Sequence, residues 1–130
     1  MTQFGSVIPR FPVFDLAVTV DFYTRRLGFE VGVAWPAQKP TFVIMRRDGT
    51  SVGFFEPNEH QPGPPGYAEL YLEVEGVSEL HAELAAILPI EWGPEVYSYG
   101  RREFAVRDPN RYLLIFTEVT TDPPSTSEPG

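Results

Sequence analysis

The chain has 130 residues, of which 42% are hydrophobic, and this length suits one domain of about 100–200 residues with a real core. Eighteen acidic and ten basic side chains give a formal charge of −8, which would repel a phosphate backbone, so nucleic acid is not expected as a partner. The sequence has no cysteine, which excludes disulfides, thiol catalysis and cysteine-bound metals, and no apolar run reaches the ~18–20 residues of a membrane span. No signal-peptide pattern opens the chain, so a cytoplasmic location is the expectation.

Residues 5–56 read as one group of elements. A helix is predicted after Asp15, a residue type that caps helices, and its apolar residues recur at helical spacing until Gly28. The Asp48-Gly49 pair between two apolar runs is typical of a hairpin turn. The predicted strands of this group are residues 7–13, 29–35, 41–47 and 51–56.

Residues 67–118 read in the same order, after a proline-rich loop at 57–66. In the first strand of this group, Leu70 and Leu72 alternate with Tyr71, as expected of a strand with one buried face. The predicted strands are residues 67–74, 90–97, 102–108 and 112–118. The helix between the first two has an apolar stripe made of Val77, Leu80, Leu84 and Ile87. The polar, proline-containing tail at 121–130 is expected to be disordered.

The turns of the two groups match. Arg47-Asp48 opens the last hairpin of the first group, and Arg107-Asp108 opens that of the second group 60 residues later. A repeat of this length with the order βαβββ in each half indicates a duplicated unit. The sequence therefore predicts an α+β fold made of two tandem βαβββ modules.

Two stretches resemble a known superfamily. Residues 8–29 (IPRFPVFDLAVTVDFYTRRLGF) and 102–118 (REFAVRDPNRYLLIFTE) resemble the opening and the last hairpin of vicinal-oxygen-chelate proteins, the glyoxalase, bleomycin resistance and dioxygenase superfamily. The proline in the first strand and the Arg-Glu-Phe-Ala that precedes Arg-Asp-Pro are most similar to the bleomycin-resistance branch. The resemblance implies a single domain over residues 1–120, in which the two modules form a curved mixed sheet around a cleft.

The resemblance also locates the positions that hold a metal ion in other members. These four positions correspond to Ile8, Phe54, Glu69 and Ile115. Three are apolar, and one carboxylate cannot complete an octahedral site for a divalent cation. We therefore expect no metal, no cofactor and no catalytic residue of the family type, because that chemistry needs the ion as its electrophile. Catalysis by Glu69 as a general base remains an open alternative.

The same register predicts a ligand site. Because side chains alternate along strands, Phe54 is predicted to share one wall with Arg10 and Glu56 in the first half, and Glu69 with Tyr71 in the second. Such an aromatic wall with carboxylates suits a flat or cationic small molecule. The candidate ligand-binding residues are Trp35, Phe54, Glu56, Glu69, Tyr71, Trp92, Tyr97, Tyr99, Arg102 and Ile115. The alternative for the tryptophans and tyrosines is packing in a core or an interface. For Arg102 and Glu103 the alternative is a structural ion pair or solvation of the hairpin.

Three functional hypotheses follow. The resemblance favours a metal-free binding protein that sequesters a cationic or aromatic small molecule, such as a glycopeptide antibiotic, in the cleft of a homodimer. Pro9 and Pro12 restrict strand pairing and favour an N-terminal arm that exchanges between subunits. The alternatives are a glyoxalase-like or dioxygenase-like enzyme with an atypical site, and a dimeric interaction module without a small ligand.

Overall fold

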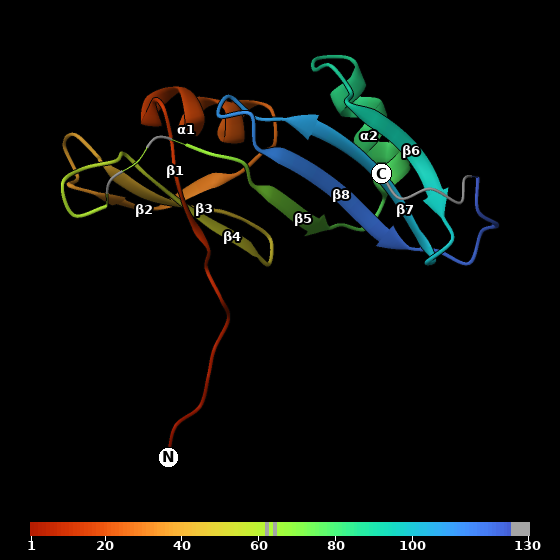
Figure 1. Cartoon of the computed structure of the whole chain (residues 1–130), viewed down its shortest axis with the longest axis horizontal. Coiled ribbons are helices and arrows are strands. Elements are labelled where there is room, and N and C mark those ends of the chain that lie inside the picture. Colours follow the sequence, from red (N-terminus) through yellow and green to blue (C-terminus); the bar gives the residue numbers. More distant parts are fainter. Residues whose placement is uncertain (62, 64, 126–130) are drawn as a thin grey trace. The chain divides into compact units, whose positions relative to one another are not determined.

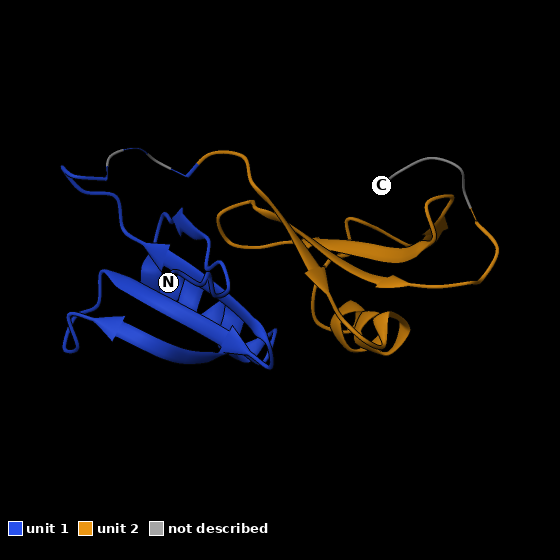
Figure 2. Ribbon diagram, turned by 90° about the horizontal axis from the view of Figure 1, so that it is seen from below, with its two compact units in different colours: residues 1–65 blue, residues 66–130 orange. Residues whose placement is uncertain are grey.

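The computed structural model describes residues 1–61, 63 and 65–125 and divides the chain into two compact units, residues 1–65 and 66–130 (Figure 2). We call these units the first and second modules. Each is a four-stranded mixed sheet with one helix on one of its faces. The predicted pair of βαβββ modules is confirmed.

The first module contains β1, α1, β2, β3 and β4 (Figure 1). Their bounds are Arg10–Pro12, Leu16–Arg25, Glu30–Trp35, Phe42–Arg47 and Thr50–Phe55. The sheet order is β1-β4-β3-β2, in which β1 lies parallel to β4 and the other neighbours are antiparallel. Asp15 caps α1 as predicted, because its carboxylate accepts a hydrogen bond from the backbone N–H of Val18 at 3.0 Å.

The first strand is shorter than predicted. Strand β1 begins after Pro9, whose carbonyl accepts a hydrogen bond from the Gly53 backbone N–H, and residues 1–7 extend away from the rest of the first module without regular structure (Figure 1). Phe4 and Val7 in this segment are 93% and 85% exposed. Proline cannot donate a hydrogen bond to a neighbouring strand, which accounts for a strand that starts only beyond it.

The prediction that Phe54 lies on the ligand-binding wall of the sheet is wrong, because its side chain faces α1. Strand β1 pairs with β4 so that Arg10 lies opposite Gly53 and Phe11 lies opposite Phe54. The Phe54 ring is fully buried and contacts the Tyr23 ring of α1 at a centroid distance of 4.7 Å. The face away from α1 therefore carries Gly53 and Phe55, and the Arg10 guanidinium lies over the Phe55 ring at 5.3 Å. This register packs better than the predicted one, because it buries Phe54 against the helix and places Gly53 beside the long Arg10 side chain.

The second module contains β5, α2, β6, β7 and β8. Their bounds are Glu69–Glu73, Val77–Ala85, Trp92–Tyr97, Arg101–Arg107 and Leu113–Val119. The sheet order is β5-β8-β7-β6, in which β5 lies parallel to β8. On the face of the sheet toward α2, the buried apolar side chains include Leu114, Phe104 and Phe116. The Phe104 ring contacts the His81 ring of α2 at a centroid distance of 5.2 Å. Of the predicted helical stripe, Val77 and Leu84 are buried, while Leu80 is half-buried and Ile87 lies beyond the end of α2.

The start of the predicted disordered tail contacts the sheet. The Ser125 backbone N–H donates to the Val96 carbonyl at 2.9 Å, and Asp122 forms an ion pair with Arg102. Residues 126–130 of the predicted tail lie outside the described residues. Neither helix in the described part of the chain has the length and apolar character of a membrane span.

Candidate ligand-binding face

The charge of the protein is concentrated in the second module. Residues 66–130 hold twelve of the 18 acidic side chains and four of the ten basic ones. Residues 1–65 hold six of each, so the whole formal charge of −8 falls on the second module. A negative potential over this module attracts cationic ligands.

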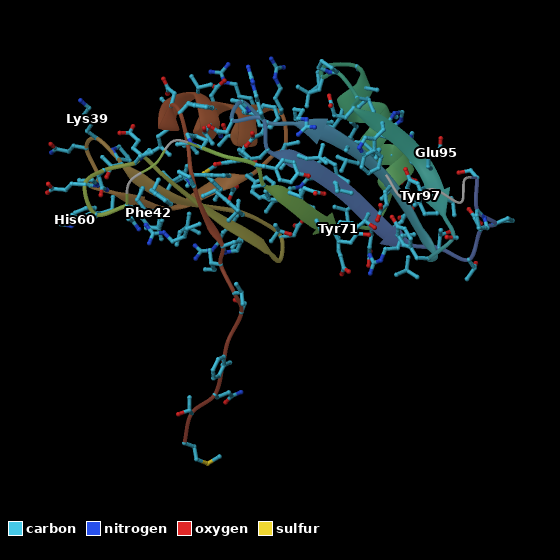
Figure 3. All side chains as sticks on the ribbon, viewed as in Figure 1. Lys39, Phe42, His60, Tyr71, Glu95 and Tyr97 are labelled. Atoms are coloured by element: carbon cyan, nitrogen blue, oxygen red, sulfur yellow. The ribbon has the colours of Figure 1, made fainter. Side chains whose placement is uncertain are left out.

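The sheet of the second module has one face away from α2, which we call the open face. Leu70 and Leu72 of β5 are buried while Tyr71 between them is exposed, so the predicted alternation is confirmed. Cross-strand pairing extends this face over β8 and β7. Its side chains are Glu69, Tyr71, Glu73, Arg101, Glu103, Ala105, Leu113, Ile115 and Thr117. Figure 3 labels Tyr71 of β5 and Tyr97 of β6 in this module.

A buried carboxylate lies in the open face. Glu103 of β7 is only 2% exposed. Its Oε1 accepts a hydrogen bond from the Tyr99 hydroxyl at 2.6 Å, and its Oε2 accepts one from the Thr117 hydroxyl at 2.8 Å and another from the Tyr71 hydroxyl. None of the ion pairs among the described residues includes Glu103. The carboxylate is thus satisfied by three hydroxyl donors, and the Arg101 guanidinium reaches it only through the Thr117 hydroxyl, to which it donates at 3.4 Å.

The tyrosines around Glu103 keep their protons. Burial and the hydrogen bond to Glu103 both raise the pKa of Tyr71, and the same two causes raise the pKa of Tyr99 further. Burial, with the negative charges of Glu95 and Glu103, raises the pKa of Tyr97. The Tyr71 and Tyr99 hydroxyls are therefore hydrogen-bond donors to Glu103 throughout the neutral range.

Aromatic rings surround the carboxylate. The Tyr97 and Tyr99 rings stack at a centroid distance of 5.6 Å with 8° between their planes, and the Trp92 ring meets Tyr97 edge-on at 6.2 Å. The Tyr71 and Tyr99 side chains remain 49% exposed. The structure thus brings together four of the predicted ligand residues, Tyr71, Trp92, Tyr97 and Tyr99.

A glycine allows this arrangement. Gly93 of β6 has a φ of +84°, and a Cβ there would lie 2.4 Å from the backbone oxygen of Glu103. Only glycine permits so close an approach of β6 to β7. The register shift between Trp92 and Glu95 lies at the same place, so that Trp92 packs against Ala105 and Ile115 of the open face.

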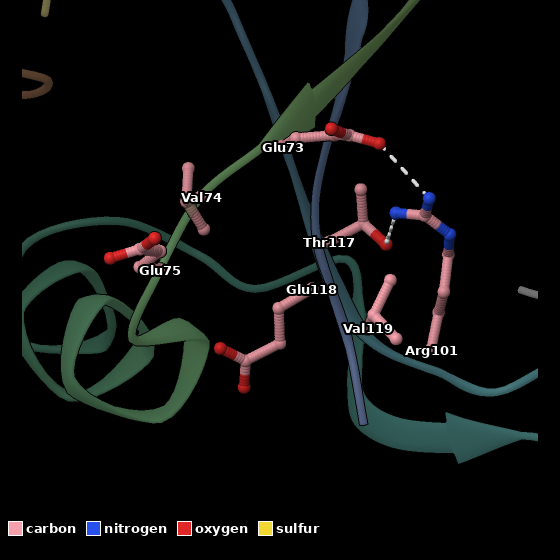
Figure 4. A pocket seen from close by; sticks show the side chains of 7 residues that line it. All are labelled: Glu73, Val74, Glu75, Arg101, Thr117, Glu118 and Val119. Atoms are coloured by element: carbon pink, nitrogen blue, oxygen red, sulfur yellow. Dashed lines mark hydrogen bonds and ion pairs between the residues drawn. The ribbon is translucent and has the colours of Figure 1, made fainter. Parts of the chain in front are cut away.

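A shallow depression of about 470 Å³ adjoins the carboxylate. Its lining side chains are Glu73, Val74, Glu75, Arg101, Thr117, Glu118 and Val119 (Figure 4). Arg101 donates to Glu73 at 2.9 Å and to the Thr117 hydroxyl at 3.4 Å, and Thr117 in turn contacts Glu103. Thr117 therefore lies between the depression and the buried carboxylate of Glu103.

The remaining predicted residues are distributed over both modules. Trp35 ends β2 and is largely exposed, and Glu56 follows β4; with Phe54 they belong to the first module. In the second module, Ile115 lies buried in the open face, and Glu69 is exposed and accepts a hydrogen bond from the Tyr67 hydroxyl.

Arg102, a predicted ligand residue, forms structural ion pairs. It leaves β7 on the α2 side and pairs with Glu118 at 3.0 Å and with Asp122, and not with Glu103 as the structural alternative expected. The predicted ligand residues did not include Glu103, the next residue, which was expected only in a structural role. The signal was the alternation along Arg-Glu-Phe-Ala, which places Arg102 and Glu103 on opposite faces.

The residues at the family's metal positions do not suit a divalent cation. Ile8 and Ile115 carry no donor atom, and Phe54 is buried against α1. The residues that take its place on the other face of β4, Gly53 and Phe55, carry no side-chain donor either. Within residues 1–61, 63 and 65–125, no group of three or more histidine, aspartate or glutamate side chains is placed to hold a metal ion.

Comparison with known proteins identifies relatives. The family model described as Glyoxalase/Bleomycin resistance protein/Dioxygenase superfamily matches residues 5–116. No curated protein matches the chain.

Solved structures share the fold. TnmS3, an antibiotic binding protein from Streptomyces sp. CB03234, is similar with a TM-score of 0.75 over 92% of this chain and 100% of that one, at 20% identity. A bleomycin-binding protein complexed with bleomycin has a TM-score of 0.68 over 88% and 98% of the two chains, at 20% identity. Lactoylglutathione lyase from Agrobacterium tumefaciens has a TM-score of 0.71 over 90% and 96%, at 17% identity. The fold therefore occurs in binding proteins and in an enzyme, and the site must decide between them.

Proposed function

Since the chain belongs to the Glyoxalase/Bleomycin resistance protein/Dioxygenase superfamily, we propose that it is a binding protein that sequesters a cationic, aromatic small molecule without a metal ion. The observation that carries the proposal is the buried Glu103 carboxylate, which is held by hydroxyls and forms no ion pair with a cation among the described residues. Buried charges in proteins are normally paired. A cationic ligand bound on the rings beside Glu103 adds a positive charge close to the carboxylate.

Two further observations support a cation. The second module carries the entire formal charge of −8, which favours the approach of cations over anions. The half-exposed rings of Tyr71 and Tyr99 offer stacking surface beside the carboxylate, and Tyr97 backs the Tyr99 ring. A glycopeptide antibiotic with a planar aromatic part and a cationic tail fits both features.

We also propose that the protein is a cytoplasmic homodimer. Phe4 and Val7 in the extended segment 1–9 expose apolar surface that a second copy of the chain would cover. Exchange of this segment between subunits is the arrangement that the short strand β1 favours.

Calorimetric titration of chelator-treated protein with metal-free bleomycin tests the antibiotic version. We expect measurable heat at micromolar concentrations, unchanged by added metal ions. No heat and no change in fluorescence at high micromolar concentration would overturn that version. A stoichiometric Mn, Fe, Ni or Zn in protein purified without chelator would instead support the enzyme alternative.

A further inference from the structure

We propose that Glu103 is a positioning residue, which holds the rings of Tyr71 and Tyr99 so that a planar organic cation binds by stacking on them. This inference rests on the proposed function and deepens it, because it names the class of ligand and the surface that the ligand meets. The Glu103 carboxylate then acts on the ligand only through the two tyrosines and does not contact it.

The carboxylate fixes two rings from distant parts of the module. Tyr71 comes from β5, whereas Tyr99 lies in the turn that joins β6 to β7. Their hydroxyls donate to different oxygens of the same carboxylate, Tyr71 to Oε2 and Tyr99 to Oε1. A phenol that donates to a fixed acceptor loses freedom of rotation, so the two rings are held in place before a ligand arrives.

The carboxylate also changes the rings electronically. A hydroxyl that donates to an anion gains partial phenolate character, and this raises the electron density over the ring and its attraction for cations. The structure contains one such contact, because the Arg101 guanidinium lies over the Tyr71 ring at 5.6 Å. This ring therefore attracts a planar cation within the protein itself, and a ligand cation stacks on the ring area that Arg101 leaves exposed.

Burial decides between stacking and direct contact. Glu103 is 2% exposed, while Tyr71 and Tyr99 are each 49% exposed. Tyr97 is buried and stacks on Tyr99 at 5.6 Å, so it supports the exposed Tyr99 ring from one side. A ligand that approaches the open face meets ring surface and reaches the carboxylate only if the rings move.

The test uses two tricyclic probes, the planar cation proflavine and the neutral acridone. Their affinities are measured by fluorescence on the full chain and on four variants, Glu103→Gln, Tyr71→Phe, Tyr99→Phe and Glu83→Gln. Glu83 is exposed on α2, so Glu83→Gln is the matched control for loss of one negative charge in the same module. Near-ultraviolet circular dichroism confirms that each variant is folded, and the two phenylalanine variants carry the test if Glu103→Gln does not fold.

We expect Glu103→Gln, Tyr71→Phe and Tyr99→Phe each to weaken proflavine binding about tenfold, with acridone binding and the Glu83→Gln control within about twofold of the wild type. The tyrosine absorption of Glu103→Gln should also lose the red shift that donation to a carboxylate causes. If the phenylalanine variants bind proflavine as well as or better than the wild type, the inference is overturned, because a cation that pairs directly with Glu103 gains from freed oxygens. Failure of the wild type to bind proflavine also overturns it, whereas bleomycin binding decides the proposed function separately.

Discussion

Arg102 and Glu103 are neighbours on β7, and their side chains leave the strand on opposite faces of the sheet. The Arg102 guanidinium donates to Glu118 at 3.0 Å on the α2 side, while Glu103 accepts the Tyr99 hydroxyl at 2.6 Å in the open face. The two charged residues therefore serve different purposes, because Arg102 pairs with Glu118, the acceptor at the start of α2, while Glu103 organises the candidate ligand site. Substitutions at the two positions should separate stability from binding.

Replacing Arg102 with methionine should destabilise the protein without changing ligand affinity. The Arg102 and Glu118 side chains are each 21% exposed, so the loss of their hydrogen-bonded ion pair should lower the free energy of unfolding by about 1–2 kcal/mol. Urea denaturation measures the stability and proflavine titration the affinity. A tenfold loss of affinity in folded Arg102→Met protein would return Arg102 to the ligand site.

Glu118 should make stability depend on acidic pH. Burial alone would raise its pKa, but the hydrogen bonds from Arg102 and from the backbone N–H groups of Val77 and Gly76 hold the pKa below the ordinary value of 4.5. A carboxyl group whose pKa is lowered in the folded state stabilises that state above the unfolded pKa. This stability is lost as the pH falls below 4.5 through the folded value.

The matched variant for this prediction is Glu118→Gln. Its amide keeps the size of the side chain but loses the charge at the start of α2. Urea denaturation from pH 7 to pH 3 should show a smaller loss of stability in the variant than in the wild type. Parallel curves for the two proteins would show that Glu118 does not contribute to the pH dependence.

The sequence was a good guide wherever the signal was local. Asp15 before an apolar helical pattern and Asp48-Gly49 between two strands each specify a backbone conformation within a few residues, and the structure confirms both. The alternation of Leu70, Tyr71 and Leu72 likewise fixed the faces of β5, because polar and apolar positions differ there.

The sequence did not predict the face of Phe54, where the pattern of polar and apolar residues is uninformative. It also did not predict the contacts of Glu103, whose partners are distant along the chain. Strand β4 ends in Val-Gly-Phe-Phe, in which no polar residue marks a face, so the register that buries Phe54 comes only from packing against Tyr23. The hydroxyl donors of Glu103 come together only through the parallel pairing of β5 with β8, which brings Tyr71 beside Thr117. No spacing along the chain encodes that contact.

Replacing Phe54 with alanine should therefore affect stability alone. The ring is fully buried against Tyr23 of α1, and its loss leaves a cavity that should cost about 3–5 kcal/mol. Thermal and urea denaturation measure this cost. Phe54→Leu, which refills part of the space, is the milder companion variant and should bind proflavine like the wild type. A folded Phe54→Leu protein with affinity reduced tenfold would contradict the observed register.

Tyr99→Phe tests the link between Glu103 and its hydroxyl donors through alkaline pH. The variant removes the donor to Oε1 and should cost about 1 kcal/mol at neutral pH, a low value because half of the Tyr99 side chain is exposed. Burial and the bond to Glu103 raise the pKa of Tyr99 above its ordinary 10.0, so this contribution is complete below pH 10.0 and is lost as the pH rises through the folded value. Urea denaturation at a series of pH values should therefore show the gap between the two proteins narrowing above pH 10.0. A gap that stays constant through that range would mean that the Tyr99 hydroxyl does not stabilise the carboxylate as a protonated donor.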